Sequence, residues 1–221
     1  MEFYHVLNRG VEKRQIFMED GDRVRFVHGL FQFNRDLPAN NTSWNIATRG
    51  INDLRGRYLG AGRLVDLHAW VLMGNHYHLL LSERADGALS KFIMRLNVGY
   101  AKYFNEKYKR SGALFQGRTK KVHVGDDSHF LHIVHYIHLN PLDFLAGAQE
   151  WRARNITSAA RAIEHLDSYR WSSFRDYCGK KNFPSILTTE YFGDVFGSYA
   201  KALRTYLNDL DASPLEAPEL E

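Results

Sequence analysis

The sequence predicts an α+β fold in which an antiparallel sheet follows the split βαβ (ferredoxin-like) plan and carries the helices of that plan on one face. Two observations predict it. Between residues 3 and 124, β-rich runs and amphipathic helical runs follow one another in the order β-α-β-β-α-β. The two central β-rich runs are separated only by Gly74-Asn75, a two-residue hairpin signal. A further helix and a helical C-terminal extension follow this core.

The first three elements are predicted from local patterns. The run FYHVLN alternates between apolar and polar residues, which predicts a strand ending at the Arg9-Gly10 turn. Residues 21–35 place their apolar side chains on one side of a helix. Residues 36–63 are rich in glycine and asparagine and predict an irregular insertion. The run LVDLHAWVLM then predicts the second strand.

The remaining elements follow in the same way. The run HYHLLLS predicts a third strand, and residues 88–110 form a long amphipathic pattern typical of a helix. Residues 114–124 predict a fourth strand. A cap at Asp126-Asp127-Ser128 predicts a helix that stops at Asn140-Pro141. Two more helices are expected near 157–166 and 193–210.

We expect two parts of the chain. Residues 1–145 would form one domain with an insertion at about 36–63, and residues 146–221 an extension packed on it, acidic from about residue 205. The 221 residues are 44% hydrophobic and 24% charged, which is ordinary for a soluble globular protein. The apolar runs are too short to cross a bilayer, so no membrane partner is expected. Cys178 is the single cysteine, which excludes an intramolecular disulfide and favours the cytoplasm.

Positive charge is concentrated in one stretch of the chain. The formal net charge is +4, but five acidic residues and no basic one follow Arg204. Between Lys107 and Gly125 there are six basic residues and no acidic one. Such a stretch favours a polyanionic partner, commonly nucleic acid, although charge alone is equally compatible with a solvated loop.

Two histidines follow the predicted hairpin turn. Residues two apart on a strand share a face, so His76 and His78 point to the same side. A two-residue loop places His76 opposite Met73 and His78 opposite Val71. Two neighbouring imidazoles on an apolar strand pair provide half of a site for a divalent metal, and alone they are weak evidence for one.

A second polar pair lies on the predicted helix before Pro141. At 100° per residue, Tyr136 and Asn140 share a stripe that lies nearly opposite the apolar side formed by Phe130, Val134 and Ile137. A tyrosine beside a bound metal can attack a phosphodiester, because the metal orients the phosphate and withdraws charge from phosphorus. The covalent phosphotyrosine conserves the bond energy, which suits strand transfer without ATP.

Several motifs together resemble one family. The chain is similar to HUH-type single-tyrosine transposases, specifically the REP-associated tyrosine transposase branch of the insertion-sequence transposases. The matching segments run in order along the chain: HVLNRG (5–10), MGNHYH (73–78), SGALFQGR (111–118), YIHLNP (136–141) and YRWSSF (169–174). The sequence departs from the family pattern at Gly74, where proline is usual.

The resemblance implies a function and a site. It implies metal-dependent nicking and rejoining of single-stranded DNA, at or near hairpins. Tyr136 would form a 5′-phosphotyrosine, and His76, His78 and Asn140 would hold Mg²⁺ or Mn²⁺. This branch leans towards monomers rather than dimers that exchange the tyrosine helix. The expected DNA contacts are basic: Arg9, Arg110, Arg118, Lys120 and Lys121.

Three other functions remain as alternatives. A replication initiator or relaxase of the HUH type is disfavoured, because relaxases carry the tyrosine ahead of the histidine pair. A catalytically idle protein that binds hairpin DNA is a second alternative, and a small metal-dependent hydrolase with a structural Tyr136 is the third. The segment GALFQGRT is close to a phosphate-loop pattern, but arginine replaces its lysine and a strand follows it, so we expect no nucleoside triphosphate.

Overall fold

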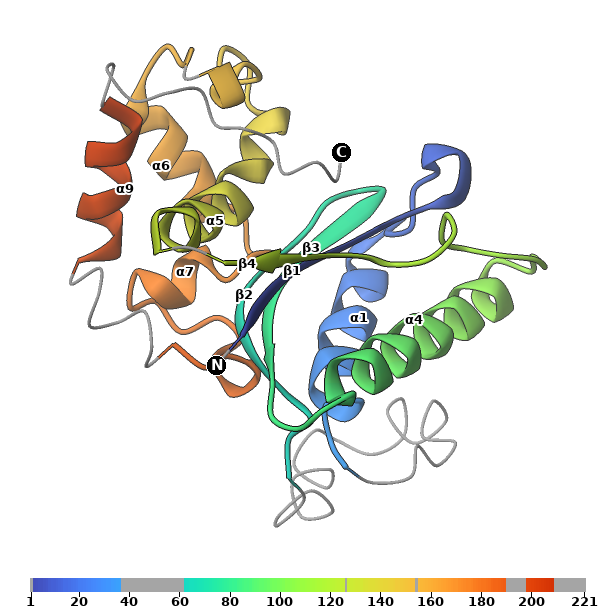
Figure 1. Ribbon diagram of the computed structural model, residues 1–221. Coiled ribbons are helices and arrows are strands. Elements are labelled where there is room, and N and C mark those ends of the chain that lie inside the picture. The colour runs from blue at the N-terminus through green and yellow to red at the C-terminus, as the bar shows by residue number, and fades with distance from the viewer. Residues whose placement is uncertain (1, 37–61, 126, 154, 190–197, 209–221) are drawn as a thin grey trace.

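The computed structural model describes residues 2–36, 62–125, 127–153, 155–189 and 198–208 (Figure 1). At its centre is a four-stranded sheet in the order β2-β3-β1-β4, with every neighbouring pair antiparallel. The strands are β1 (Phe3–Arg9), β2 (Val65–Leu72), β3 (His76–Glu83) and β4 (Lys120–Val124). This order is that of the split βαβ plan, so the predicted fold class is confirmed.

Helices cover both faces of the sheet (Figure 1). The two helices of the βαβ plan, α1 (Asp20–Gln32) and α4 (Ala88–Lys107), pack together on one face. On the other face lies α5 (Asp127–Leu139), which contacts β2 and β3. The C-terminal helices surround α5: α6 (Ala159–Ser168), α7 (Phe174–Tyr177) and α9 (Tyr199–Asn208).

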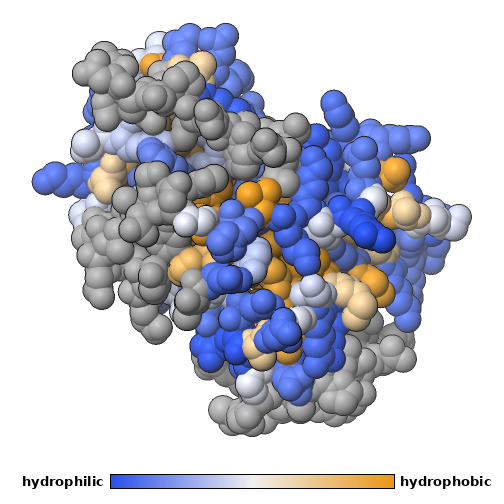
Figure 2. Space-filling view, in the orientation of Figure 1, coloured by the Kyte–Doolittle hydropathy of each residue, from blue (hydrophilic) through white to orange (hydrophobic). Residues whose placement is uncertain are grey.

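Alternation along the strands produces two hydrophobic cores. Trp70 and Leu79 point into the core under α1 and α4. Val71 and Leu80, one position further along, point into the core under α5. Figure 2 shows mainly hydrophilic side chains over the described surface of this view, with the hydrophobic ones gathered near its middle. None of the helices within the described ranges is both long and apolar enough to cross a membrane.

The hairpin between β2 and β3 has the predicted two-residue turn. The backbone N–H of Met73 donates to the carbonyl of His76 at 2.8 Å, and Val71 lies opposite His78. The segment after β1 wraps this turn, since the N–H groups of Ile16 and Phe17 both donate to the carbonyl of Gly74. A Cβ at position 74 would lie 2.1 Å from Oε1 of Gln15, so the side chain of Gln15 occupies the space that a larger residue would need.

Some predicted boundaries were wrong. The fourth strand covers Lys120–Val124 rather than 114–124, and the helix predicted over 88–110 ends at Lys107. Before β4, an isolated bridge joins Gly10 and Phe115. The start of the last predicted helix, most of the 36–63 insertion and the acidic tail lie outside the described residues.

The C-terminal extension also joins the sheet. A bridge pairs Ser172 with Val71 of β2, and the N–H of Leu72 donates to the carbonyl of Trp171 at 2.9 Å. The N–H of Ser173 donates in turn to the carbonyl of Trp70. The extension therefore covers the outer edge of β2, an edge that would otherwise present unpaired backbone groups.

Candidate active site

The histidine pair lies on the face of β3 that α5 covers. His78 is fully buried and His76 is 8% exposed, and their ring centroids are 4.9 Å apart. Each Nδ1 atom has a close partner: His76 Nδ1 lies 2.6 Å from Oδ1 of Asn75, and His78 Nδ1 lies 2.9 Å from Nε2 of His5. The strand therefore holds both imidazoles in fixed orientations.

Helix α5 brings Tyr136 to this pair. The ring of Tyr136 lies 5.9 Å from that of His78 and 6.0 Å from that of His5, centroid to centroid. The contact predicted from two segments about sixty residues apart is therefore present. Tyr136 is only 2% exposed, whereas the sequence placed it on a stripe away from the apolar side. That stripe is also buried, because α5 lies between the sheet and the C-terminal helices.

Asn140 begins the 3₁₀ turn η2 (Asn140–Phe144) that follows α5. Its amide Nδ2 donates to the carbonyl of Tyr136 at 2.8 Å, as expected for residues one turn apart. Its Oδ1 accepts a hydrogen bond of 3.3 Å from the guanidinium of Arg152. Asn140 is completely buried. The predicted ligand oxygen thus lies next to a positive charge.

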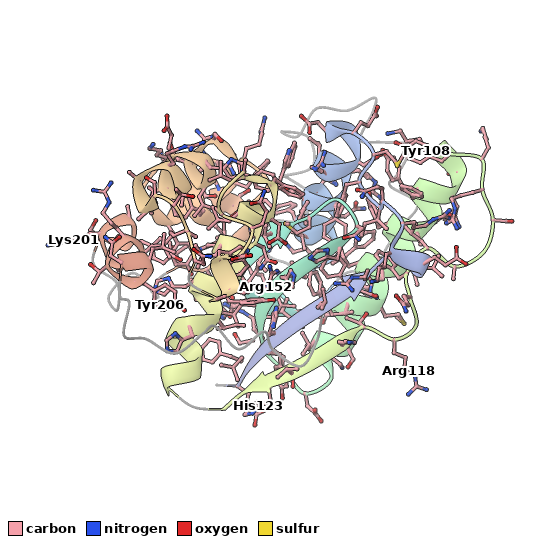
Figure 3. All side chains as sticks on the ribbon, turned by 90° about the horizontal axis from the view of Figure 1, so that it is seen from above. Tyr108, Arg118, His123, Arg152, Lys201 and Tyr206 are labelled. Atoms are coloured by element: carbon pink, nitrogen blue, oxygen red, sulfur yellow. The ribbon has the colours of Figure 1, made fainter. Side chains whose placement is uncertain are left out.

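Two residues beside the tyrosine, and the aspartate that binds both of them, were missed by the sequence reasoning. Arg152 pairs with Asp143 at 2.7 Å, and its guanidinium carbon lies 5.8 Å from the ring centroid of Tyr136. Trp151 packs on Tyr136 at 5.5 Å and donates from Nε1 to Asp143 at 2.7 Å. Figure 3 places Arg152 between the C-terminal helices and the sheet. No periodic spacing in the sequence relates these residues to Tyr136. They reach it because the chain reverses direction between Asn140 and Trp151.

The electrostatic setting keeps the central imidazole neutral. Burial lowers the pKa of His78 well below its usual range, and His76, His5, Arg152 and Arg9 lower this pKa further by charge repulsion. A neutral imidazole is the form that binds a metal.

The predicted basic residues divide between the two faces of the sheet. Arg9 lies opposite His76 in the β1–β3 register. Lys120 lies opposite Leu7, which also pairs with His78, so these three side chains share one face. Lys121, the next residue of β4, points to the other face and donates to Ser90 of α4.

The other two predicted DNA contacts lie before β4. Arg118 is exposed and extends outward from the loop preceding the strand (Figure 3). Arg110 donates to Asn105 and to the carbonyl of Ala113. Of the five basic residues, the register therefore places Arg9 and Lys120 on the face of the histidine pair.

A metal at this site would depend on mixed ligands. Across the described ranges, no three His, Cys, Asp or Glu side chains are grouped so that they could hold an ion. His76 and His78 offer two imidazole nitrogens, and Asn140 would add an amide oxygen that here accepts from Arg152. This donor chemistry fits Mg²⁺ or Mn²⁺ less tightly than a carboxylate cluster would and also fits softer divalent ions.

Comparison with known proteins finds similarity to transposases over the middle of the chain. Comparison with curated protein sequences gives no match. A solved structure, described as the REP-associated tyrosine transposase bound to a REP hairpin, aligns at 13% identity with a TM-score of 0.45, over 85% of this chain and 84% of that one. Residues 59–140 match the family model described as "Transposase IS200 like", and this segment contains the histidine pair, Tyr136 and Asn140. Residues 59–140 are thus similar to the IS200-like transposases, the group that the motifs of this chain resemble.

Proposed function

We propose that the protein nicks and rejoins single-stranded DNA through a covalent 5′-phosphotyrosine on Tyr136. One observation carries the proposal: a tyrosine from α5 lies against a pair of histidines from β3, within 6 Å of the His78 ring. The match to the transposase family supports a DNA-processing enzyme. We also retain the cytoplasm as the expected location.

The chemistry assigns a role to each side chain. The phenol oxygen of Tyr136 attacks phosphorus and loses its proton, while the bond to the 3′ oxygen breaks and that oxygen takes up a proton. Attack by the 3′-hydroxyl of another strand end reverses the step, which conserves the phosphodiester bond. His76, His78 and Asn140 would hold Mg²⁺ or Mn²⁺. Such an ion, when bound, polarises a phosphate oxygen and stabilises the charge that develops on it.

Positive side chains around the site would bind the DNA backbone. Arg152 is held beside Tyr136 by Asp143, which favours a role in binding the phosphate under attack. Arg9 and Lys120 lie on the same sheet face and would bind flanking phosphates. Unpaired bases beside a hairpin stem suit such a surface, because the strand can follow the basic side chains while its bases remain accessible.

We further propose that the protein acts as a monomer. Tyr136 lies against the histidine pair of its own chain, which supports a site formed within one copy. An enzyme that exchanged the tyrosine helix would instead place Tyr136 beside the histidines of a partner. Gel filtration combined with light scattering, with and without hairpin DNA, tests this proposal.

A second candidate function is supported by the burial of the tyrosine. Trp151 and Arg152 cover Tyr136, which is 2% exposed, so a phosphate reaches the phenol only after this cover shifts. A protein that holds hairpin DNA without cutting it would be compatible with a permanently covered tyrosine.

A covalent-adduct assay separates the two functions. Labelled single-stranded hairpin DNA is incubated with Mn²⁺ and the products are separated in SDS. We expect an SDS-resistant adduct with the wild type and none with Tyr136→Phe. Tyr77→Phe is the matched control, because Tyr77 lies between the two histidines but bonds Asn97 on the opposite face. Binding without any wild-type adduct supports the idle protein, and an adduct in Tyr136→Phe identifies a different nucleophile.

A further inference from the structure

Each histidine of the pair has a close partner at its Nδ1 atom, so a bound cation would be coordinated through Nε2. We propose that Asn75 and His5 are positioning residues: Asn75 fixes the tautomer of His76, and His5 accepts the Nδ1 proton of His78 when a divalent cation binds, so that both rings present an unprotonated Nε2 to the cation. The inference rests on the proposed metal dependence and deepens it, because it assigns a role to two residues outside the ligand set.

The orientation of Asn75 is set by the main chain. Its Nδ2 donates to the carbonyl of Lys13 at 3.1 Å, which fixes the amide so that Oδ1 faces His76. An amide oxygen only accepts hydrogen bonds, so the Nδ1 of His76, 2.6 Å away, carries the proton. A neutral imidazole has one N–H, and Nε2 of His76 therefore carries a lone pair and no proton.

The loop that supplies the Lys13 carbonyl is held in a costly conformation. Glu12 and Lys13 adopt φ values of 56° and 57°, in the left-handed region that residues other than glycine rarely occupy. Such a conformation persists where the surrounding structure enforces it. Here the N–H of Gly10 donates to the carbonyl of Asn75 at 2.8 Å, so the loop and the hairpin turn bond each other in both directions. The loop thus places the carbonyl of Lys13 where it accepts a hydrogen bond from the Asn75 amide.

His5 holds the second imidazole. The rings of His5 and His78 are nearly parallel, at 13°, with centroids 5.1 Å apart and a nitrogen–nitrogen distance of 2.9 Å. This geometry is that of two rings joined edge to edge by an in-plane N–H···N bond. Only one of the two nitrogens carries the proton. If His78 donates it, Nε2 of His78 is free of a proton and can bind a cation; if His5 donates it, Nε2 cannot. Cation binding therefore selects His5 as the acceptor.

The positions of Asn75 and His5 in the sequence explain why both lie beside the histidine pair. Asn75 directly precedes the first histidine, so its short side chain reaches the Nδ1 atom of the next residue. His5 lies on β1, two residues before Leu7, which pairs with His78, and so it points to the same face as the histidine pair. Partners of this kind fix ring orientation at metal sites, and their loss typically weakens metal affinity about 10- to 100-fold.

The tautomers can be read without metal. Long-range ¹H–¹⁵N spectra of histidine-labelled, metal-free protein distinguish a protonated Nδ1 from a protonated Nε2. We expect the Nδ1–H form for His76 in the wild type and in Asn75→Asp, which keeps the acceptor. In Asn75→Ala we expect the Nε2–H form to become populated. A wild-type His76 with its proton on Nε2, or an unchanged spectrum in Asn75→Ala, overturns the proposal.

Metal affinity provides the second readout. Mn²⁺ binding is followed by electron paramagnetic resonance. We expect Asn75→Ala and His5→Phe to bind Mn²⁺ about 10- to 100-fold more weakly, and Asn75→Asp to bind at least as well as the wild type. Asn105→Ala is the matched control, because its amide also bonds a backbone carbonyl, that of Gly112, in another loop. It should bind within about twofold of the wild type.

The two readouts separate this inference from the proposed function. If wild-type protein binds no Mn²⁺ at the pair, shown by equal binding in His76→Ala, the proposed metal dependence fails, and the spectra still decide whether Asn75 fixes the His76 tautomer. If the wild type binds Mn²⁺ and Asn75→Ala and His5→Phe bind it equally well, the metal site stands and the positioning role is overturned.

Discussion

Two adjacent lysines of β4 provide a sharp test of where DNA lies. Lys120 and Lys121 are both exposed and differ by one position, but the strand alternation sends them to opposite faces. Lys120 lies in one row with Leu7 and His78, two strand spacings, or about 9–10 Å, from the histidine. Lys121 reaches Ser90 of α4 on the far face. A strand bound at the histidine pair should therefore contact Lys120 and not Lys121.

The expected magnitude follows from counterion release. Each phosphate neutralised by a basic side chain contributes about 0.7 to the salt slope of log K for single strands and about 0.9 for duplex DNA. One such contact raises the affinity about five- to eightfold when the salt concentration falls from about 1 M to about 0.1 M. Losing the contact therefore costs about 1 kcal/mol of binding free energy at about 0.1 M salt. Lys120→Ala should show this loss, whereas Lys121→Ala should bind as the wild type does.

The assay is a fluorescence-anisotropy titration of labelled hairpin DNA at several salt concentrations, performed without divalent metal so that no cleavage occurs. The slope of log K against log salt should decrease by about 0.7–0.9 for Lys120→Ala alone. Equal slopes for the two variants, or a larger effect of Lys121→Ala, would refute the assignment of DNA to the α5 face of the sheet.

Three further outcomes are expected. Gly99→Ala should lower the free energy of unfolding in urea by about 1–3 kcal/mol despite the better helix propensity of alanine, because the new Cβ would lie 2.4 Å from the ring of Phe33; a stabilised variant contradicts this. Burial disfavours the Asp22 carboxylate, but hydrogen bonds from a lysine and two tyrosines outweigh burial and hold its pKa below the usual value. The ionised Asp22 carboxylate therefore stabilises the fold above pH about 4, and this stabilisation is lost as the pH falls through the folded-state pKa. Asp22→Asn should consequently show a smaller acid-induced loss of stability than the wild type. An equal loss contradicts this. Asp143→Asn should weaken the ion pair with Arg152 and so reduce adduct formation more than DNA binding, both measured on the same hairpin. A parallel loss of adduct formation and DNA binding would assign Asp143 to binding alone.

Local patterns predicted the elements of the sheet and the contact between its site residues. The Gly74-Asn75 turn fixed the register of His78 against Val71, because a two-residue loop permits only one pairing. The i to i+4 spacing likewise placed Asn140 one turn beyond Tyr136. Where glycine changes the backbone direction, the prediction was wrong. Gly117 has φ +67°, which interrupts the run that was predicted as strand from residue 114.

The missed residues depend on contacts between distant parts of the chain. Trp151 and Arg152 reach Tyr136 only because η2 and the turn after it reverse the chain, and no periodicity encodes that reversal. No local pattern assigned a role to His5. Its partner is 73 positions away on a neighbouring strand, so the pairing follows from the β1–β3 register and not from any local spacing.

The back of α5 shows why the C-terminal extension belongs to the site. His138 is completely buried and bonded at both nitrogens, to Tyr199 of α9 and to Ser173, each at 2.7 Å. Ser173 also bonds the main chain of Trp70 on β2. The extension thus joins the helix that carries Tyr136 to the sheet that carries the histidine pair. The alignment of Tyr136 with the histidine pair therefore depends on both parts of the chain, and we propose that residues 1–145 and the described part of the extension work as a single unit.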